Sequence, residues 1–288
     1  MRNAVILAAG TASRFVPLSE ETPKGLLEVR GEILIERQIR QLMEAGVQDI
    51  CVVVGYKAPL FAYLSDKFGV QLVENVDYAR YNNISSVIPV LDGLDETFLC
   101  CSDHYFERNV FQDESPVSYY AVQYAEGATK EWCIREDESG RIRQVTIGGR
   151  DAWYLAGHAF FTPAFSRLIR PLLQDAYQHE EARLGYWEDV LIRHLDDLPI
   201  YARRYAPDDL KEFDSLDELR AFDARYLDDT RSGIIRDICS RLHCQEWELT
   251  HFEPVKHVGE HLLFTFAWGP TTYCYDGREQ SVTRMENE

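Results

Sequence analysis

The chain has 288 residues, of which 45% are hydrophobic, and a formal net charge of −18. A chain of this size and composition can bury a core without disulfide bonds or a structural metal. The acidic balance argues against wrapping a nucleic acid, because binding a phosphate backbone needs clustered Lys and Arg. A nucleotide is not excluded, because one basic loop can bind it on an otherwise acidic protein.

Cysteine usage and hydropathy predict the compartment. No early stretch joins a basic start to a long apolar core, and no run of about 20 apolar residues occurs, so we expect neither a signal peptide nor a membrane span. The seven cysteines include no CxxC motif. Free thiols fit this pattern better than a disulfide framework or a zinc site, and they predict a reducing compartment, the cytoplasm.

The first hundred residues alternate between apolar strand patterns and helical periodicity. The first apolar run ends in small residues, which is typical of a buried parallel strand. Repeated β-α-β units predict a Rossmann-like α/β fold, with a mostly parallel sheet and ligands at the carboxyl ends of its strands. The expected strands are residues 4–8, 50–54, 70–73 and 98–101, and the expected helices are residues 33–45, 60–68 and 85–94.

The middle of the chain has a different pattern. Short strand-like runs are separated by turn residues such as Glu138-Ser139-Gly140, which predicts an added antiparallel region. Helices return after it, and Asp214 or Ser215 is the expected N-cap of the last one. The expected strands are residues 117–124, 132–135, 142–147, 156–161 and 200–206, and the expected helices are residues 164–177, 187–195 and 215–226.

The pattern restarts near Asp228-Asp229-Thr230, with a helix expected at 234–242 and strands at 252–258, 262–267 and 272–275. We therefore predict two domains, residues 1–229 and a small α+β appendage of residues 230–288. The appendage is too small to stand alone. It is expected to pack against the first domain or against another copy of the chain in a homo-oligomer, and its apolar contacts are expected to be Trp247, Phe252, Phe264, Phe266 and Trp268.

The strongest chemical signal is a loop after the first strand, followed by Pro17 and by Thr22-Pro23-Lys24. Its backbone amides can form an anion-binding nest, and Arg14 and Lys24 add positive charge for a triphosphate. An ordinary glycine turn with two surface cations is the alternative, but the combined spacing favours a nucleotide site. The loop is neither a GxGxxG motif nor a Walker loop. Its expected nucleotide-binding residues are Leu7, Ala8, Ala9, Gly10, Thr11, Ala12 and Ser13.

This loop resembles the signature of the sugar-phosphate and phosphocholine nucleotidylyltransferases, although Thr11-Ala12 stands where a glycine is common. Over about residues 1–228, further motifs resemble the CTP:phosphocholine cytidylyltransferase branch. The resemblance implies cytidylyl transfer from CTP to phosphocholine, and nucleotide contacts by Gly55, Tyr56, Asn83 and Ser85. The motifs that carry it are Val54-Gly55-Tyr56, Asn82-Asn83, Glu131-Trp132, Tyr186-Trp187 with Asp189, and Glu212-Phe213-Asp214.

Carboxylates for a magnesium ion are the next expectation. Asp103 follows an apolar strand and should stand at the carboxyl end of the sheet, where its oxygens can bind Mg²⁺. The resemblance implies that Asp214 is a second metal ligand, with Glu212 as a further candidate. The structural alternatives are a loop carboxylate for Asp103 and a helix cap for Asp214.

Aromatic residues supply a candidate site for a quaternary ammonium, which donates no ordinary hydrogen bond and is recognised by ring faces and carboxylates. Trp132, Tyr186 and Trp187 are the candidate rings, and Asp189 and Glu188 are the available carboxylates. Packing in the core is the alternative, and it is the commonest use of Trp and Tyr. The resemblance favours the cage for Trp132 and Tyr186, and less so for Trp187.

Phosphate chemistry needs no nucleophilic side chain here, because the second pKa of a substrate phosphate is about 6. We expect Lys24 to hold the α-phosphate and Arg14 to steady the leaving pyrophosphate. The histidines show no ligand spacing and are interpreted as structural or surface residues.

Other substrates and a different class of protein remain as alternatives. A sugar 1-phosphate or an aminoalkyl phosphonate would undergo the same chemistry, and a non-catalytic nucleotide-binding protein would lack the charged set that is present here. The sequence Ile235–Cys244 and the strands after it resemble the opening of a choline kinase N-lobe. The likeness stops before any kinase Lys or Asp, so no kinase activity is expected.

Overall fold

The computed structural model describes residues 2–112, 114–255 and 262–285. The chain divides into two compact units, each of which is described by itself. The first comprises Met1–Gly10 and Leu34–Glu212, and the second comprises Thr11–Ile33 and Phe213–Glu288. This division differs from the expected boundary near residue 230. Its physical reason is that the segment from Thr11 to Ile33 leaves the first strand and packs with the C-terminal part of the chain.

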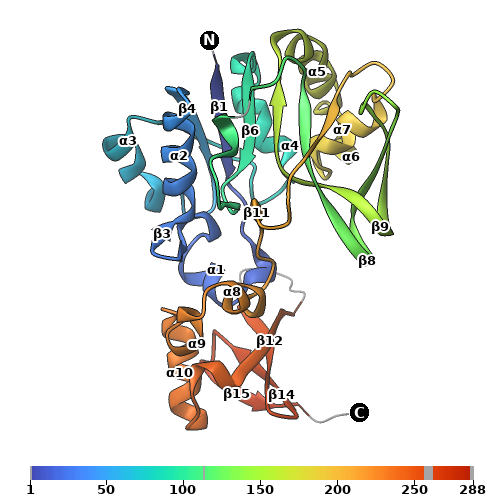
Figure 1. Ribbon diagram of the computed structural model, residues 1–288. Coiled ribbons are helices and arrows are strands. Elements are labelled where there is room, and N and C mark those ends of the chain that lie inside the picture. The colour runs from blue at the N-terminus through green and yellow to red at the C-terminus, as the bar shows by residue number, and fades with distance from the viewer. Residues whose placement is uncertain (1, 113, 256–261, 286–288) are drawn as a thin grey trace. The chain divides into compact units, whose positions relative to one another are not determined.

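A seven-stranded sheet forms the first unit, and it confirms the Rossmann-like, mostly parallel fold (Figure 1). The strand order is β10-β8-β9-β6-β1-β4-β5. β1 runs parallel to β4 and β6, and β9 runs antiparallel to β6 and β8. The strands are β1 (Asn3–Ala8), β4 (Asp49–Val54), β5 (Gln71–Glu74), β6 (Thr97–Cys101), β8 (Tyr119–Glu136), β9 (Ile142–Phe161) and β10 (Tyr201–Arg204).

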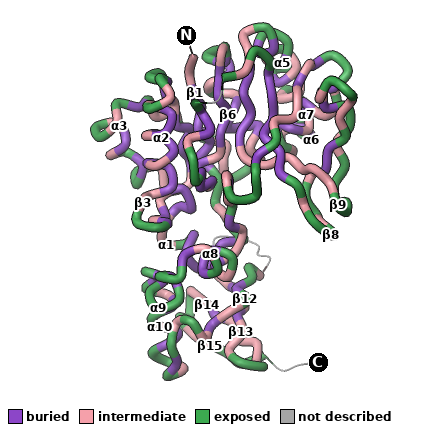
Figure 2. Tube along the Cα trace, in the orientation of Figure 1, coloured by how far each residue is buried: buried purple, intermediate pink, exposed green. Residues whose placement is uncertain are grey.

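The antiparallel region consists of two long strands, and the expectation of four short ones was wrong. β8 has 18 residues and β9 has 20 residues. Their pairing continues through several register shifts, and Gly127, Gly148 and Gly157 have positive φ angles within it. Glycine adopts such angles without strain, so these positions bend the strands and do not end them. Figure 2 shows that only a part of β8 and a part of β9 are buried.

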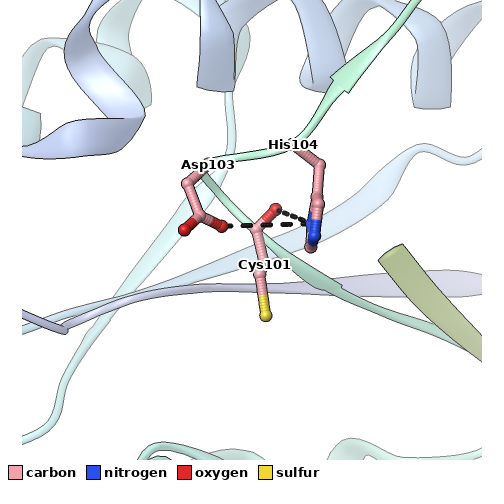
Figure 3. A group of neighbouring side chains, drawn as sticks. All are labelled: Cys101, Asp103 and His104. Carbon is pink, nitrogen blue, oxygen red and sulfur yellow. Dashed lines mark hydrogen bonds and ion pairs between the residues drawn. The ribbon is translucent and has the colours of Figure 1, made fainter. Parts of the chain in front are cut away.

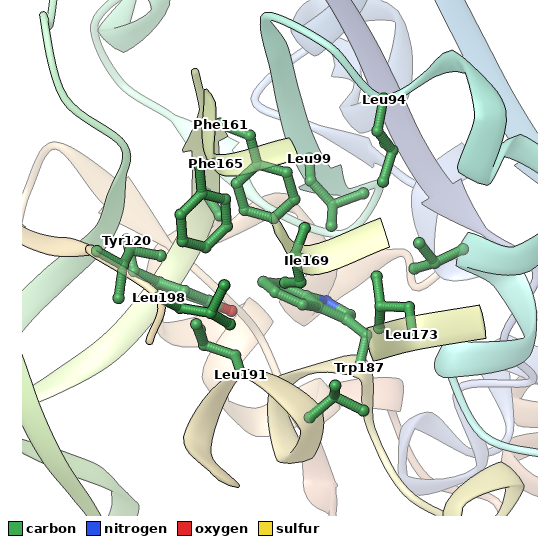
Figure 4. Packing of buried hydrophobic residues seen from close by; sticks show 14 of the residues in the cluster. Leu94, Leu99, Tyr120, Phe161, Phe165, Ile169, Leu173, Trp187, Leu191 and Leu198 are labelled. Atoms are coloured by element: carbon green, nitrogen blue, oxygen red, sulfur yellow. The ribbon is translucent and has the colours of Figure 1, made fainter. Parts of the chain in front are cut away.

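Helices of the first unit bury one face of the sheet. Phe165, Ile169 and Leu173 of α5 pack with Trp187 of α7 and with Leu99 of β6 in one apolar cluster (Figure 4). The cluster gives the sheet a rigid support on which the carboxyl ends of the strands are fixed. The helices are α2 (Leu34–Glu44), α3 (Tyr63–Phe68), α4 (Ile84–Val87), α5 (Pro163–Ala176), α6 (Glu180–Arg183) and α7 (Trp187–Arg193).

Two short strands of the first unit were not expected from the sequence. β7 (Tyr105–Phe106) pairs antiparallel with β11 (Leu210–Lys211), so that Tyr105 lies opposite Lys211. This pairing brings the residues just after β6 beside the end of β11.

The second unit combines the loop segment with the C-terminal elements. The helix expected at 215–226 is interrupted at Asp223, whose backbone leaves the helical region, and is therefore two helices. Ser215 caps the first of them, as expected. The helices are α1 (Leu18–Glu21), α8 (Leu216–Phe222), α9 (Arg225–Asp228) and α10 (Gly233–Leu242).

A small hairpin and a four-stranded antiparallel sheet complete the second unit. The expected strand at 252–258 corresponds to β12 up to Pro254, and residues 256–258 lie outside the described residues. β15 was not expected. The hairpin strands are β2 (Glu28–Val29) and β3 (Glu32–Ile33), and the sheet strands, in order, are β12 (Leu249–Pro254), β13 (Leu263–Trp268), β14 (Thr271–Asp276) and β15 (Ser281–Arg284).

Phe252, Phe264 and Phe266 are buried and pack on one another in the second unit, whereas Trp247 is 54% exposed. The expected docking of this segment stays a prediction. The order of one helix followed by antiparallel strands is as predicted, and its likeness to a choline kinase lobe stays a prediction. All seven cysteines are free thiols. Within the described ranges, every helix is too short or too polar to span a lipid bilayer.

Candidate active site

At the carboxyl end of β1, the backbone lies close to the segment that follows β4. The amide of Tyr56 donates to the carbonyl of Ala9 at 3.0 Å. A Cβ atom on Gly55 would lie 2.8 Å from the side chain of Tyr78 and 2.9 Å from Cβ of Ala9. Only glycine fits there, which explains the Val54-Gly55-Tyr56 motif. The structure thus places the predicted residues Leu7 to Gly10, Gly55 and Tyr56 together in the first unit.

The remainder of the predicted nucleotide loop belongs to the second unit. Thr11, Ala12 and Ser13 lead into a single 3-10 turn, Ser13–Phe15. Ala12 has a φ of 48°, which is a left-handed conformation that glycine adopts more readily. This geometry accounts for the glycine that is common at this position in the resembled family.

Arg14, Lys24 and Asp214 form a charged group within the second unit. Nη1 of Arg14 lies 2.7 Å from Oδ2 of Asp214, and Nζ of Lys24 lies 3.9 Å from Oδ1 of the same carboxylate. Lys24 is only 8% exposed, and its Nζ lies 5.8 Å from the centroid of the Phe15 ring. A nearly buried ammonium interacts strongly with an anion because little water screens it.

The same geometry decides against a capping role for the Asp214 side chain. Oγ of Ser215 accepts the amide of Glu218 and thereby caps α8. The carboxylate of Asp214 instead lies against the two cations. The structure favours Ser215 over Asp214 as the cap of α8, and the role of Asp214 as a metal ligand stays a prediction from the resemblance.

In the first unit, Asp103 follows β6 as predicted, and His104 lies beside it (Figure 3). Nδ1 of His104 lies 3.9 Å from Oδ1 of Asp103 and 3.3 Å from the carbonyl oxygen of Cys101. Nε2 of His104 lies 3.3 Å from Oε2 of Glu212. Because β7 pairs with β11, the structure brings together Asp103 and Glu212, which are far apart in the sequence. His104 between them was missed, and its only sequence signal was its place next to Asp103 after a buried strand.

The group offers one sulfur, one carboxylate and one imidazole. Cys101 Sγ, a carboxylate oxygen of Asp103 and a ring nitrogen of His104 lie within 4.8 Å of one another. A thiol and an imidazole are not the donors that magnesium prefers. The carboxylates of Asp103 and Glu212 remain, and Mg²⁺ prefers such oxygen donors.

The two aromatic residues favoured for a cage lie in contact. The rings of Trp132 in β8 and Tyr186 at the start of α7 are 5.5 Å apart between centroids, with an interplanar angle of 88°. Tyr186 is 45% exposed and Trp132 is half-buried, so both rings are accessible to a ligand. Two rings at right angles present an edge and a face, and the face attracts a cation.

Four other predicted site residues have internal contacts instead. Trp187 is 2% exposed and stacks on Tyr120 in the core, so it is placed for packing. Oδ2 of Asp189 accepts the amide of Tyr186 at 2.7 Å and fixes the start of α7. Ser85 is 2% exposed, and Asn83 accepts the amide of Trp187 at 2.8 Å. These contacts do not favour direct ligand binding by the four residues.

Glu188, the second residue of α7, has a buried carboxyl group. Its Oε1 accepts the hydroxyl of Tyr120 at 3.0 Å, and its Oε2 accepts the amide nitrogen of Asn83 at 3.1 Å. Burial raises the pKa of Glu188 to about 7, against the lowering effect of these hydrogen bonds. The group therefore changes its charge near neutral pH.

This raised pKa predicts a pH-dependent stability. The folded state binds the proton of Glu188 more tightly than the unfolded state, so this contribution is complete below about pH 4.5 and is lost as pH rises through about 7. Glu188→Gln should remove the dependence. Relative to wild type, the variant should gain up to about 3 kcal/mol in free energy of unfolding over this range.

Urea denaturation followed by tryptophan fluorescence between about pH 4.5 and 8 measures the difference, with the exposed Glu181→Gln as the matched control. Parallel pH profiles for wild type and Glu188→Gln would contradict the raised pKa.

Comparisons with known proteins show the family of the chain. Residues 4–129 match the model of the MobA-like NTP transferase domain. The chain is 36% identical to the 2-aminoethylphosphonate cytidylyltransferase of Lancefieldella rimae over 78% of this chain and 93% of that protein. It is 32% identical to the choline-phosphate cytidylyltransferase of Streptococcus pneumoniae over 75% of this chain and 95% of that protein. A solved structure of CTP:phosphocholine cytidylyltransferase from the same species superposes with a TM-score of 0.74, covering 76% of this chain and 96% of that one.

Proposed function

Because the chain belongs to the nucleotidyltransferases with a MobA-like NTP transferase domain, and cytidylyltransferases are among its relatives, we propose that it transfers the cytidylyl group of CTP to phosphocholine. The products are CDP-choline and pyrophosphate. The observation that carries the choice of phosphocholine is the accessible, perpendicular pair of Trp132 and Tyr186. A quaternary ammonium presents only methyl groups, so ring faces suit it better than hydrogen-bond acceptors do.

A second candidate substrate is 2-aminoethylphosphonate. It is favoured by the 36% identity to the relative from Lancefieldella rimae, whose name carries that substrate. Its primary ammonium group donates hydrogen bonds and needs carboxylate acceptors. Glu131 is exposed and adjoins Trp132 in β8, so one carboxylate stands in the sequence next to the aromatic pair. The same transfer chemistry applies to either acceptor.

The charged residues are assigned by their place in the sequence motifs. In the second unit, Lys24 and Arg14 neutralise the triphosphate, Lys24 at the α-phosphate and Arg14 at the leaving pyrophosphate. Asp103 and Glu212 in the first unit and Asp214 in the second are proposed as Mg²⁺ ligands. A bound Mg²⁺ supplies charge neutralisation for the phosphate oxygens during the transfer.

The transfer itself needs no covalent enzyme intermediate. An oxygen of the substrate phosphate attacks the α-phosphorus of CTP, and the bond from that phosphorus to the bridging oxygen breaks in line. Pyrophosphate leaves with the electron pair of this bond. The contribution of the protein is therefore positioning and charge.

Trp132→Ala tests the substrate assignment. A desolvated cation–π contact contributes up to about 2 kcal/mol, so the KM for phosphocholine should rise by tens-fold while the KM for CTP changes little. Trp132→Phe keeps a ring face and should lose less. Steady-state pyrophosphate release measures both constants, with Trp247→Ala as the control for removing an exposed tryptophan.

An unchanged KM for phosphocholine in Trp132→Ala would show that the aromatic pair does not bind the choline group. A wild-type enzyme that used 2-aminoethylphosphonate faster than phosphocholine would favour the second candidate.

A further inference from the structure

The carboxylate of Glu21 lies at the N-terminus of α10, although the two are far apart in the sequence. Oε1 of Glu21 accepts the amide of Gly233 at 2.7 Å, and Oε2 accepts the hydroxyl of Ser232. A Cβ atom on Gly233 would lie only 3.0 Å from Oε1. The glycine therefore permits a close approach that a larger residue would disturb.

This contact adds a charge to a helix end that already has its own cap. Oγ of Ser232 accepts the amide of Ile235 at 3.1 Å, and Ser232 is 2% exposed. Glu21 then adds a full negative charge where the ten-residue helix α10 has its positive end. A charged acceptor of two hydrogen bonds at a partly buried helix end is a strong local anchor.

The anchor lies immediately before the phosphate-binding lysine. Glu21 is the last residue of α1, and only Thr22 and Pro23 separate it from Lys24. Proline fixes one of the backbone angles on this short path. A restraint on the Glu21 side chain is therefore transmitted to the backbone of Lys24 with little freedom between them.

Apolar packing at this junction is incomplete. A cavity of about 240 Å³ lies between part of the loop segment and the residues around Thr230. Further polar links join the side chain of Glu28 to Arg231 at 3.0 Å and to Arg225 at 3.3 Å, and both pairs are at least 40% exposed and therefore weak. The hydroxyl of Tyr226 also donates to the carbonyl of Glu28 at 3.0 Å. The residues that line the cavity include Leu18, Leu26, Leu27, Ile33, Tyr226 and Arg231.

We propose that Glu21 is a positioning residue through which α10 holds the Lys24 segment in place for the triphosphate. The consequence for binding rests on the proposed function, since it takes CTP as the ligand of Lys24. The consequence for the backbone does not rest on it. The C-terminal elements of the second unit are then part of the nucleotide-binding apparatus.

Hydrogen exchange of the full chain without ligand tests the backbone consequence. In Glu21→Ala, amides of residues 22–27 should exchange roughly ten times faster than in wild type, because the anchored segment opens more often. Glu21→Gln keeps an acceptor for Gly233 and should restore part of the protection. Glu20→Ala, an exposed change on the same helix, should leave exchange unchanged. Unchanged exchange in Glu21→Ala would overturn the proposal whatever the enzyme's ligand is.

A double-mutant cycle tests the binding consequence. Glu21→Ala should raise the Kd for CTP, measured calorimetrically with Mg²⁺, by roughly ten-fold, because a small displacement of a positioned group has a large effect. In a Lys24→Ala background, the same change should have little further effect. An equal effect in both backgrounds would show that Glu21 does not act through Lys24. Failure of wild type to bind CTP would instead contradict the proposed function, and the exchange result would stand apart from it.

Discussion

Asp103→Asn is expected to lower kcat/KM by at least about 100-fold, which corresponds to roughly 3 kcal/mol of transition-state stabilisation. An amide has nearly the same shape as a carboxylate but lacks the charge that holds Mg²⁺ against phosphate oxygens. The fold should be unaffected, because Asp103 stands after β6 and outside the apolar cluster. Manganese binding followed by electron paramagnetic resonance gives a readout that does not depend on turnover, and it should weaken in parallel.

The control is Asp66→Asn, which removes an exposed carboxylate from α3. A purified Asp103→Asn that melts normally, binds manganese like wild type and keeps its turnover at saturating Mg²⁺ would show that the metal ligands are elsewhere.

Lys24→Ala is expected to lower kcat/KM by roughly 30- to 1000-fold, which is about 2–4 kcal/mol, as for the loss of one preorganised donor. The reason is its burial. At 8% exposure the ammonium is fixed next to Phe15 and Asp214, so its charge is available to a phosphate without reorganisation. Arg14 has a 72% exposed side chain and should contribute less, because water screens it.

Steady-state kinetics of Lys24→Ala and Lys24→Arg make this measurement, with Arg167→Ala as a control that removes one exposed positive charge from α5. Lys24→Arg should recover little, because a larger planar guanidinium does not reproduce the compact charge of a nearly buried ammonium. Wild-type kcat/KM in Lys24→Ala would exclude the lysine from the phosphate site.

The sequence predicted the fold where periodicity was strong. The parallel strands β1, β4 and β6 are continuous apolar runs, and such runs are readable because both faces of these strands are buried. The strands β7 and β11 have two residues each, which is too few to show a hydrophobic period. Their pairing could therefore not be predicted from the sequence. The long strands β8 and β9 were divided in error, because their internal glycines look like turns while the backbone only bends there.

Residues of the candidate site could be proposed from the sequence where they follow a recognisable strand or belong to a motif. Asp103 was proposed from its place after a buried strand, and Trp132 and Tyr186 were proposed from the resemblance. His104 was missed because its significance depends on Glu212, which only the β7–β11 pairing brings near. The role of Glu21 was missed for the same reason, since its partners are more than 200 residues away.

The two-unit organisation was the least predictable feature. Composition along the chain shows a restart near residue 230, and this suggested a boundary there. The structure instead groups Thr11–Ile33 with the C-terminal part, because the contacts of Glu21, Glu28 and Arg30 reach across the sequence. The composition along the sequence does not indicate discontinuous units of this kind.

Pyrophosphate release is the most direct test of cytidylyl transfer from CTP to phosphocholine. The purified full chain is supplied with Mg²⁺, with each of the four ribonucleoside triphosphates in turn, and with phosphocholine, phosphoethanolamine, 2-aminoethylphosphonate or glucose 1-phosphate as acceptor. We expect CTP with phosphocholine to give the highest kcat/KM, and phosphoethanolamine to be used less well because it lacks the methyl groups that contact ring faces. Fastest release with glucose 1-phosphate, or no release with CTP and any of the four acceptors, would contradict this expectation.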